Sequence, residues 1–147
     1  MDKATIIAQL KKDEGFSPKS FWDFKQWTWG YGTKAPSGPG LPISKEAAEI
    51  ELSAAVDKAI KEYHSLFSEV TAEINEVRQH ALVNMIYNLG PKGVANFKNM
   101  MRSIAQVKAE WALAAEHARQ SLWYRQVPSR AKRICNELER GVTLNVV

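Results

Sequence analysis

The spacing of apolar and polar residues predicts that the chain begins with a short helix. Ile6, Ile7 and Leu10 fall on one side of a helix over residues 3–13, and polar residues occupy most positions between them. Gly15 follows directly, and glycine is the residue that most often lies just past the end of a helix.

The pattern changes after this helix. Residues 16–33 lose the helical period and are dense in aromatic side chains, which predicts short strands in a hairpin or small sheet. Residues 34–42 contain three prolines and two glycines and are expected to form a loop. Ser44 is typical of a helix N-cap. The helix expected after it has apolar positions at helical spacing, namely Leu52, Val56, Ala59, Ile60 and Tyr63.

The remainder of the chain reads as helical. A break is expected near Ser68, Gly90-Pro91 is expected to stop one helix, and Gly141 is expected to close the last. The predicted helices cover about residues 74–89, 94–106, 108–119 and 129–140. The predicted fold class is therefore α+β with helices dominating.

Charge and cysteine content narrow the classes of protein. The net charge is +4, and the segment from Arg119 onward has an excess of basic residues as large as that of the whole chain. Such an excess favours a polyanionic partner: nucleic acid, an anionic membrane or an acidic cell wall. Cys135 is the single cysteine, so no intramolecular disulfide can form, and we interpret it as a buried apolar side chain.

Several sites and signals are not expected. His64, His80 and His117 lack the spacing of metal ligands, and the chain has no glycine-rich phosphate loop, so we expect no metal and no cofactor. The N-terminal residues have no signal-peptide pattern, and no apolar run is long enough to span a bilayer. The expected location is the cytoplasm in which the chain is made.

One short segment collects acid–base chemistry. Glu14 lies where the first helix meets the strands, and Asp23 and Thr28 follow it. Glycosidic bond hydrolysis needs one protonated carboxyl and one ionised carboxyl, held in different environments. Glu14, near aromatic residues, suits the acid, Asp23 suits the ionised partner, and Thr28 offers a hydroxyl for a water. Aromatic rings nearby also suit the C–H faces of sugars. Taken singly, these residues equally fit a solvated helix end and a turn.

The order of these residues resembles the signature of phage-type lysozymes, glycoside hydrolase family 24. The matching segments are Asp13-Glu14-Gly15, Phe21-Trp22-Asp23, the run Trp27 to Thr33, Val77-Arg78, Ala81 to Met85, Gly93-Val94-Ala95 with Phe97 and Asn99, and Trp123-Tyr124 with Gln126, Pro128 and Arg130 to Arg133. The chain departs from the signature in the turn after Asp23, where Phe24-Lys25-Gln26 stands in place of a sequence with glycine, and at Thr33, where a histidine is common.

The resemblance implies a single lysozyme-like domain over residues 1–147 with two lobes flanking an active cleft. A small lobe with a β-sheet would cover about 14–60, and a larger helical lobe would cover about 66–147 together with the N-terminal helix. It implies a muramidase that cleaves the β-1,4 bond between N-acetylmuramic acid and N-acetylglucosamine in peptidoglycan.

The resemblance also implies roles for single residues. Glu14 matches the proton donor, and Asp23 and Thr28 match the residues that hold the attacking water. Inversion at the anomeric carbon would place the two carboxyls roughly 6.5–9.5 Å apart. Substrate contacts are expected from four residues: Tyr87, Asn88, His117 and Arg130. We interpret His117 as a residue at the rim of the cleft rather than a general base.

The implied biological role is that of a monomeric phage endolysin. It would be bacteriolytic, reach the wall through a membrane lesion made by a holin, and neither bind nucleic acid nor insert stably into the membrane. Four alternatives stay open: a virion-associated enzyme, a catalytically inactive wall-binding relative, a lytic transglycosylase, and a membrane- or nucleic-acid-binding protein that uses its basic C-terminal segment.

Overall fold

The computed structural model describes residues 1–143, and residues 144–147, which end the predicted helical lobe, lie outside the described part. The contacts divide the chain into two compact units. We call Lys3–Lys58 the N-terminal unit, and Met1–Asp2 with the chain from Ala59 onward the helical unit.

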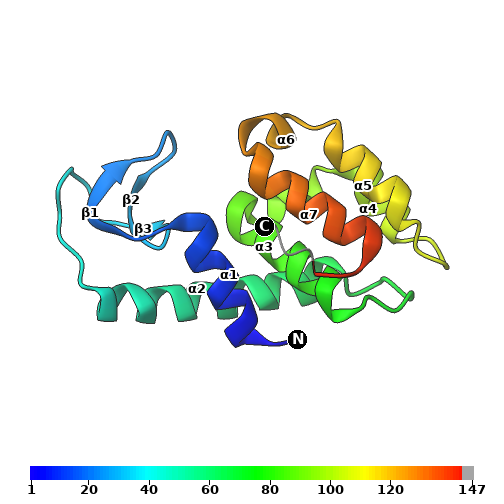
Figure 1. Cartoon of the computed structure of the whole chain (residues 1–147), viewed down its shortest axis with the longest axis horizontal. Coiled ribbons are helices and arrows are strands. Elements are labelled where there is room, and N and C mark those ends of the chain that lie inside the picture. The colour runs from blue at the N-terminus through cyan, green and yellow to red at the C-terminus, as the bar shows by residue number, and fades with distance from the viewer. Residues whose placement is uncertain (144–147) are drawn as a thin grey trace. The chain divides into compact units, whose positions relative to one another are not determined.

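The N-terminal unit combines one short helix, a small antiparallel sheet and the first part of a long helix (Figure 1). The strands follow one another in the sheet in the order β1-β2-β3. The elements are α1 (Lys3–Glu14), β1 (Ser17–Trp22), β2 (Trp27–Gly30), β3 (Thr33–Lys34) and α2 (Lys45–Leu66).

The ends of both helices follow from their capping residues. Gly15 adopts a left-handed φ of 65°, and its N–H bonds to the Lys11 carbonyl at 3.0 Å, which closes α1 as predicted. Ser44 caps α2 by accepting a hydrogen bond from the Ala47 N–H at 3.1 Å, also as predicted. The buried Ile6 and Leu10 give α1 its inner face.

The helical unit contains five helices among its described residues after α2. These are α3 (Glu76–Ala95), α4 (Lys98–Ile104), α5 (Trp111–Arg119), α6 (Leu122–Gln126) and α7 (Pro128–Arg140). The last of them, α7, packs against α3, α5 and α6, as the orange-to-red ribbon in Figure 1 shows. The fully buried side chains of the helical unit are mostly aliphatic, and they include Leu82, Val83, Ile104, Ile134 and Leu138. Gly141 ends α7 with a left-handed φ of 67°, as predicted.

One prediction about these elements needs correction, and one helix was not expected. Gly90 has non-helical angles (φ 77°, ψ 163°) and ends the first part of α3, as predicted, and a second, short helical part follows it across this kink to Ala95. The predicted helix over residues 94–106 is therefore wrong at its start, because Val94 belongs to the end of α3 and the next helix begins at Lys98. The short helix α6 was not predicted.

The structure confirms an α+β fold in which helices dominate a small antiparallel sheet. The first helix, α1, belongs to the same compact unit as the sheet. Within residues 1–143, none of the helices has the length and apolar character needed to cross a membrane.

Candidate active site

Glu14 is the last residue of α1, and its half-buried side chain lies against the backbone of Gly32. A Cβ atom built on Gly32 would lie 2.7 Å from Glu14 Oε2 and 3.0 Å from its Cδ. Gly32 also has a left-handed φ of 89°. The backbone angle therefore favours glycine at this position, and a larger residue would displace the Glu14 carboxyl. The turn after β2 fixes where the Glu14 carboxyl can lie.

Two aromatic residues lie close in sequence to these groups: Phe16 follows α1, and Tyr31 follows β2. Phe16 and Tyr31 pack with ring centroids 5.4 Å apart, and Tyr31 is buried. The ammonium of Lys11 lies 5.4 Å from the Tyr31 ring centre, within the range of a cation–π contact. These rings are thus close in sequence to Glu14 and to Gly32, against which the Glu14 carboxyl lies.

Asp23 and Thr28 are joined directly. Thr28 Oγ1 donates a hydrogen bond to Asp23 Oδ2 at 2.6 Å, and the Thr28 side chain is buried. The other carboxylate oxygen, Oδ1, accepts from the backbone N–H groups of Gln26 at 2.9 Å and Lys25 at 3.1 Å. These bonds fix the carboxylate in one orientation.

The same contacts set the protonation of Asp23. Burial by itself raises the pKa of this carboxyl, because it disfavours the charged form. The hydrogen bonds from Thr28, Gln26 and Lys25, with the charge of Lys25, outweigh burial, and the pKa of Asp23 lies below its ordinary value. Asp23 is therefore ionised at neutral pH, as the sequence analysis expected.

The turn that carries Asp23 closes without the glycine of the family signature. Trp22 and Trp27 pair across the hairpin, and the Asp23 N–H donates to the Gln26 carbonyl at 3.1 Å. Phe24 supplies the positive φ, at 80°. A residue with a side chain loses roughly 1–2 kcal/mol in this conformation. The bonds from Asp23 Oδ1 to the following N–H groups help to hold the strained turn.

Thr33, where the family often has histidine, bonds to a carboxylate of α2. Thr33 Oγ1 donates to Glu51 Oε1 at 2.6 Å, and Trp29 Nε1 donates to the same oxygen at 2.9 Å. Hydrogen bonds to Glu51 thus tie the sheet to α2 inside the N-terminal unit.

Of the substrate-contact candidates, Asn88 is engaged in a structural bond. Its Oδ1 accepts from the indole N–H of the buried Trp123 at 2.8 Å, which leaves its amide hydrogens as the donors toward a ligand. Tyr87, next to it on α3, is half-buried. Phe97 packs edge-on against Trp123 with ring centroids 5.9 Å apart. Trp123 therefore contacts both Asn88 and Phe97, and Phe97 lines the pocket described next.

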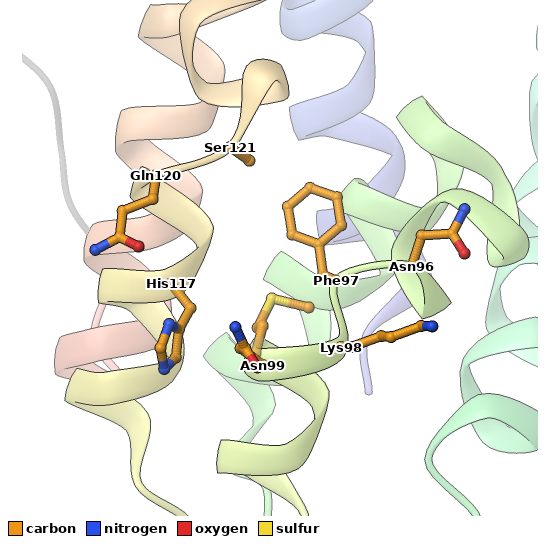
Figure 2. A pocket seen from close by; sticks show the side chains of 8 residues that line it. Asn96, Phe97, Lys98, Asn99, His117, Gln120 and Ser121 are labelled. Atoms are coloured by element: carbon orange, nitrogen blue, oxygen red, sulfur yellow. The ribbon is translucent and has the colours of Figure 1, made fainter.

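His117 lines a pocket of about 340 Å³ within the helical unit. Figure 2 shows His117 and Asn99 on facing helices with the Phe97 ring beside them. Polar side chains dominate the lining, with Phe97 and Met100 as the apolar members. The other lining residues are Asn96, Lys98, Gln120 and Ser121. Of the lining residues, only His117 was predicted as a substrate contact. Phe97 and Asn99 belong to the segments that carry the family resemblance, but no role was predicted for them.

Arg130 is held by a buried amide. Its Nε donates to Asn84 Oδ1 at 2.9 Å, and Asn84 is only 4% exposed, so the bond links α7 to α3. Two other basic residues of this segment form ion pairs, since Arg119 Nη1 lies 2.9 Å from Glu139 Oε1 and Arg133 Nε lies 3.4 Å from Glu137 Oε1.

Two expectations about other chemistry can be compared with the described residues. Cys135 is buried, and burial raises the pKa of its thiol to about 11, which supports its interpretation as a structural side chain. Across residues 1–143 we find no group of three His, Cys, Asp or Glu side chains placed to hold a metal ion.

The structure therefore brings together some candidates and not others. Glu14, Asp23 and Thr28 all belong to the N-terminal unit, and Asp23 bonds to Thr28. Tyr87, Asn88, His117 and Arg130 all belong to the helical unit. The residue that sequence reasoning did not single out is Gly32, whose lack of a side chain leaves room for the Glu14 carboxyl.

Comparison with known proteins agrees with the family resemblance of the sequence. The sequence profile of the family described as phage lysozyme matches residues 11–137. The chain is 32% identical over 157 aligned residues to the central spike protein of the pre-baseplate of Enterobacteria phage T4, an alignment that covers 88% of this chain and 27% of that protein.

Two eukaryotic proteins are also similar. Probable T4-type lysozyme 1 of Dictyostelium discoideum is 30% identical over 107 residues, which cover 73% of this chain and 61% of that protein. Probable T4-type lysozyme 2 of the same organism is 31% identical over 103 residues, covering 70% of this chain and 59% of that protein. The chain thus spans less than two thirds of the length of each of these relatives.

Proposed function

Because the chain belongs to the phage lysozyme family, a family of glycoside hydrolases, we propose that it hydrolyses peptidoglycan as a muramidase. The bond cleaved is the β-1,4 bond between N-acetylmuramic acid and N-acetylglucosamine. The observation that carries the proposal is the Asp23–Thr28 pair, in which an ionised carboxylate holds a buried hydroxyl at 2.6 Å.

Glu14 donates the proton in this mechanism. As the glycosidic bond breaks, the leaving oxygen takes the proton from the Glu14 carboxyl, and positive charge develops at the anomeric carbon. Gly32 supports this role, because its missing side chain lets the carboxyl lie against the turn after β2. A fixed position is what proton transfer over a hydrogen-bond distance requires.

Asp23 and Thr28 prepare the attacking water. Thr28 gives its hydroxyl hydrogen to Asp23, so its oxygen lone pairs are available to accept a hydrogen from a water molecule. The ionised Asp23 stabilises the positive charge at the anomeric carbon and accepts a proton from the water as the water attacks. Attack by water on the face opposite the leaving group inverts the anomeric carbon, and we expect the two carboxyls roughly 6.5–9.5 Å apart in the substrate complex.

Tyr87, Asn88, His117 and Arg130 are proposed to contact the glycan. The pocket beside His117 offers amide, hydroxyl and ammonium groups to polar substituents of the substrate. For Asn88, the contact would use its amide hydrogens, since its oxygen is bonded to Trp123. Arg130 is proposed to act through its charge on an anionic wall polymer while its Nε stays bonded to Asn84.

The test compares the parent chain with Glu14→Gln on purified Gram-negative peptidoglycan, with mass spectrometry of the products. We expect the rate of wall clearing to fall by about a thousandfold in the variant, within the range for loss of a general acid. We expect Asp23→Asn to lose activity as well. Glu69→Gln, an exposed carboxylate in the helical unit, serves as the matched control and should retain parental activity.

The products separate the chemical alternatives. Reducing muramic ends are expected from hydrolysis, whereas anhydro-muramic ends would assign a lytic transglycosylase. Equal rates for the parent and Glu14→Gln, or no clearing of several wall types, would leave a wall-binding relative without catalysis.

We further propose that the protein acts as a monomeric phage endolysin, made in the host cytoplasm and released through a holin lesion. Expression in a bacterial host should then cause lysis only when a holin is co-expressed. The similarity to a phage spike protein supports a second candidate, a lysozyme carried by the phage particle. Recovery of the chain with purified particles, rather than free in the lysate, would favour that candidate.

A further inference from the structure

The β1–β2 hairpin has two faces with different chemistry. Its register pairs Phe21 with Thr28 and Trp22 with Trp27. Directly paired residues project from the same face, and successive residues project from opposite faces. Thr28, with its bond to Asp23, therefore marks one face of the hairpin, and Trp22 and Trp27 mark the other.

The face that carries Trp22 and Trp27 is covered by α2 only at the end away from the turn. Trp29 lies on this same face by alternation with Trp27, and its indole N–H bonds to Glu51 of α2. Toward the turn, Trp22 and Trp27 contact each other edge to face with ring centroids 5.6 Å apart, and Trp22 is 55% exposed. In Figure 1 the turn between β1 and β2 lies at the end of the hairpin away from α2.

Phe24 extends this exposed aromatic group at the tip of the hairpin. Its side chain is 94% exposed, and its backbone adopts a positive φ of 80°. Within the described chain, the residue therefore combines a strained backbone with a large apolar side chain that faces solvent. Strain that packing does not offset is a common mark of a residue that serves a binding partner.

We propose that Trp22 and Trp27, on the face opposite the Asp23–Thr28 pair, form a second glycan-binding site together with Phe24 at the tip of the hairpin, and we call these three residues the aromatic surface. The chemical class of the ligand is a polysaccharide whose pyranose rings present C–H faces to the aromatic rings. This inference rests on the proposed function, because it assigns the substrate strand, or a neighbouring strand of the same wall, to the site. Its role is to hold the enzyme on an insoluble polymer.

A glycan suits the surface better than a lipid bilayer does. Asp23 lies in the same turn as Phe24, is ionised, and is only half-buried. Insertion of the tip into a bilayer would carry this carboxylate into a medium that disfavours charge. A polysaccharide is hydrated and leaves the carboxylate in water, and the exposed Lys25 in this turn adds a positive charge toward an acidic wall. The surface is also continuous with the turn that carries the candidate catalytic residue.

The test measures binding in the Glu14→Gln background, so that no hydrolysis takes place. Purified insoluble peptidoglycan sacculi are the probe, and co-sedimentation gives the affinity. We expect Trp22→Ala and Phe24→Ala each to weaken binding by about tenfold, the upper range for one aromatic contact. Ile50→Ala is the matched control, because Ile50 is an apolar side chain of the same unit that is 72% exposed on α2.

Phe24→Gly separates binding from folding. Glycine relieves the positive φ and removes a side chain that is almost fully exposed, so we expect the midpoint of urea unfolding to rise. Binding to sacculi is nevertheless expected to weaken about as much as in Phe24→Ala. A variant that is more stable and binds less tightly cannot owe its loss to unfolding.

Two results would overturn the proposal. Parental affinity for sacculi in both Trp22→Ala and Phe24→Gly would remove the aromatic surface from wall binding. Co-sedimentation with phosphatidylglycerol vesicles that depends on Trp22, with unchanged binding to sacculi, would assign the surface to anionic lipid instead. The proposed function fails separately, through unchanged wall clearing in Glu14→Gln with active-site residues otherwise intact, so the two failures are distinguishable.

Discussion

Six of the eight residues with positive φ in the described chain lie in the N-terminal unit, and two lie in the helical unit. The N-terminal unit is shorter, yet it contains the tight turns, the exposed aromatic side chains and the Asp23–Thr28 bond. The helical unit contains most of the fully buried aliphatic side chains. This difference indicates that the candidate catalytic groups are positioned by dihedral angles and hydrogen bonds, whereas the helical unit depends on packing.

The largest effect on stability is expected in the core of the helical unit. Leu82→Ala removes a fully buried side chain from α3, and we expect the free energy of unfolding to fall by about 2–5 kcal/mol because a cavity remains. Urea unfolding followed by circular dichroism measures it. Leu113→Ala, on the exposed side of α5, should cost less than about 1 kcal/mol. Equal losses in the two variants would contradict the packing account.

In the N-terminal unit, the addition of a single methyl group is expected to lower the rate of hydrolysis. Gly32→Ala places a Cβ atom 2.7 Å from Glu14 Oε2, and the carboxyl must shift. We expect kcat/KM for wall hydrolysis to fall by about a hundredfold, as for a misplaced catalytic group. Gly40→Ala is the control, because Gly40 has a similar φ of 72° but open space around its Cα. An equal fall in both variants would show that backbone strain, and not the contact with Glu14, causes the loss.

Thr28→Val tests the hydrogen bond that keeps Asp23 ionised. Without the bond from Thr28, the pKa of Asp23 should rise, because burial then meets fewer stabilising contacts. We expect kcat to fall about tenfold, as for loss of the net free energy of one hydrogen bond, and the acidic limb of the pH–rate profile to move to higher pH. Thr28→Ser keeps the hydroxyl and should restore the parental profile. An acidic limb that does not move in Thr28→Val would exclude Asp23 as the titrating group.

The free energy of unfolding should also depend on pH through the titration of Asp23. The folded chain has a lower pKa at Asp23 than the unfolded chain, so the contribution of this carboxylate is complete above the unfolded pKa and is lost as the pH falls through the folded pKa. In Thr28→Val the contribution should be smaller and its loss should be complete at a higher pH, which urea unfolding across the acidic range measures.

The smallest effect is expected at the N-terminus of the helical unit. His80 Nε2 accepts a hydrogen bond from the Asp2 N–H at 3.0 Å, and burial lowers the pKa of His80, although Glu76 and Asp2 oppose this shift. The unfolded chain therefore binds a proton at higher pH than the folded chain, and stability should fall as the pH drops below roughly 6.5. His80→Gln keeps an acceptor and should flatten this slope between pH 7.5 and 5.5.

The exposed His64 provides the comparison for that experiment, and His64→Gln should leave the slope as in the parent. A slope that is unchanged in His80→Gln would show that protonation of His80 does not cause the pH dependence of stability in this range.

Features that depend on nearby residues were predictable from the sequence. The end of α1 at Gly15, the Ser44 cap of α2 and the end of α7 at Gly141 each follow from one residue and its hydrogen bond. The phage lysozyme family was also predictable, and the comparisons confirm it. The assignments of the site residues to catalysis and binding stay predictions.

Features set by tertiary contacts were not predictable. The helix α6 is five residues long, too short to show a period, and it is held by the Ser121 cap and by Trp123, which bonds to Asn88 from another helix. The positive φ of Phe24 is equally hidden, because glycine is the residue expected in such a turn. The carboxylate of Asp23, which accepts from the two backbone N–H groups after Phe24, helps to explain how the turn forms without glycine.

The single cysteine gives the folded chain an internal reporter of its own opening. Thiol reagents react with the thiolate, and Cys135 is both buried and, with a pKa raised to about 11, almost wholly protonated at neutral pH. Labelling of the parent protein should therefore occur only when α7 leaves its neighbours α3 and α5. The labelling rate would then measure how often the helical unit opens, with no engineered probe.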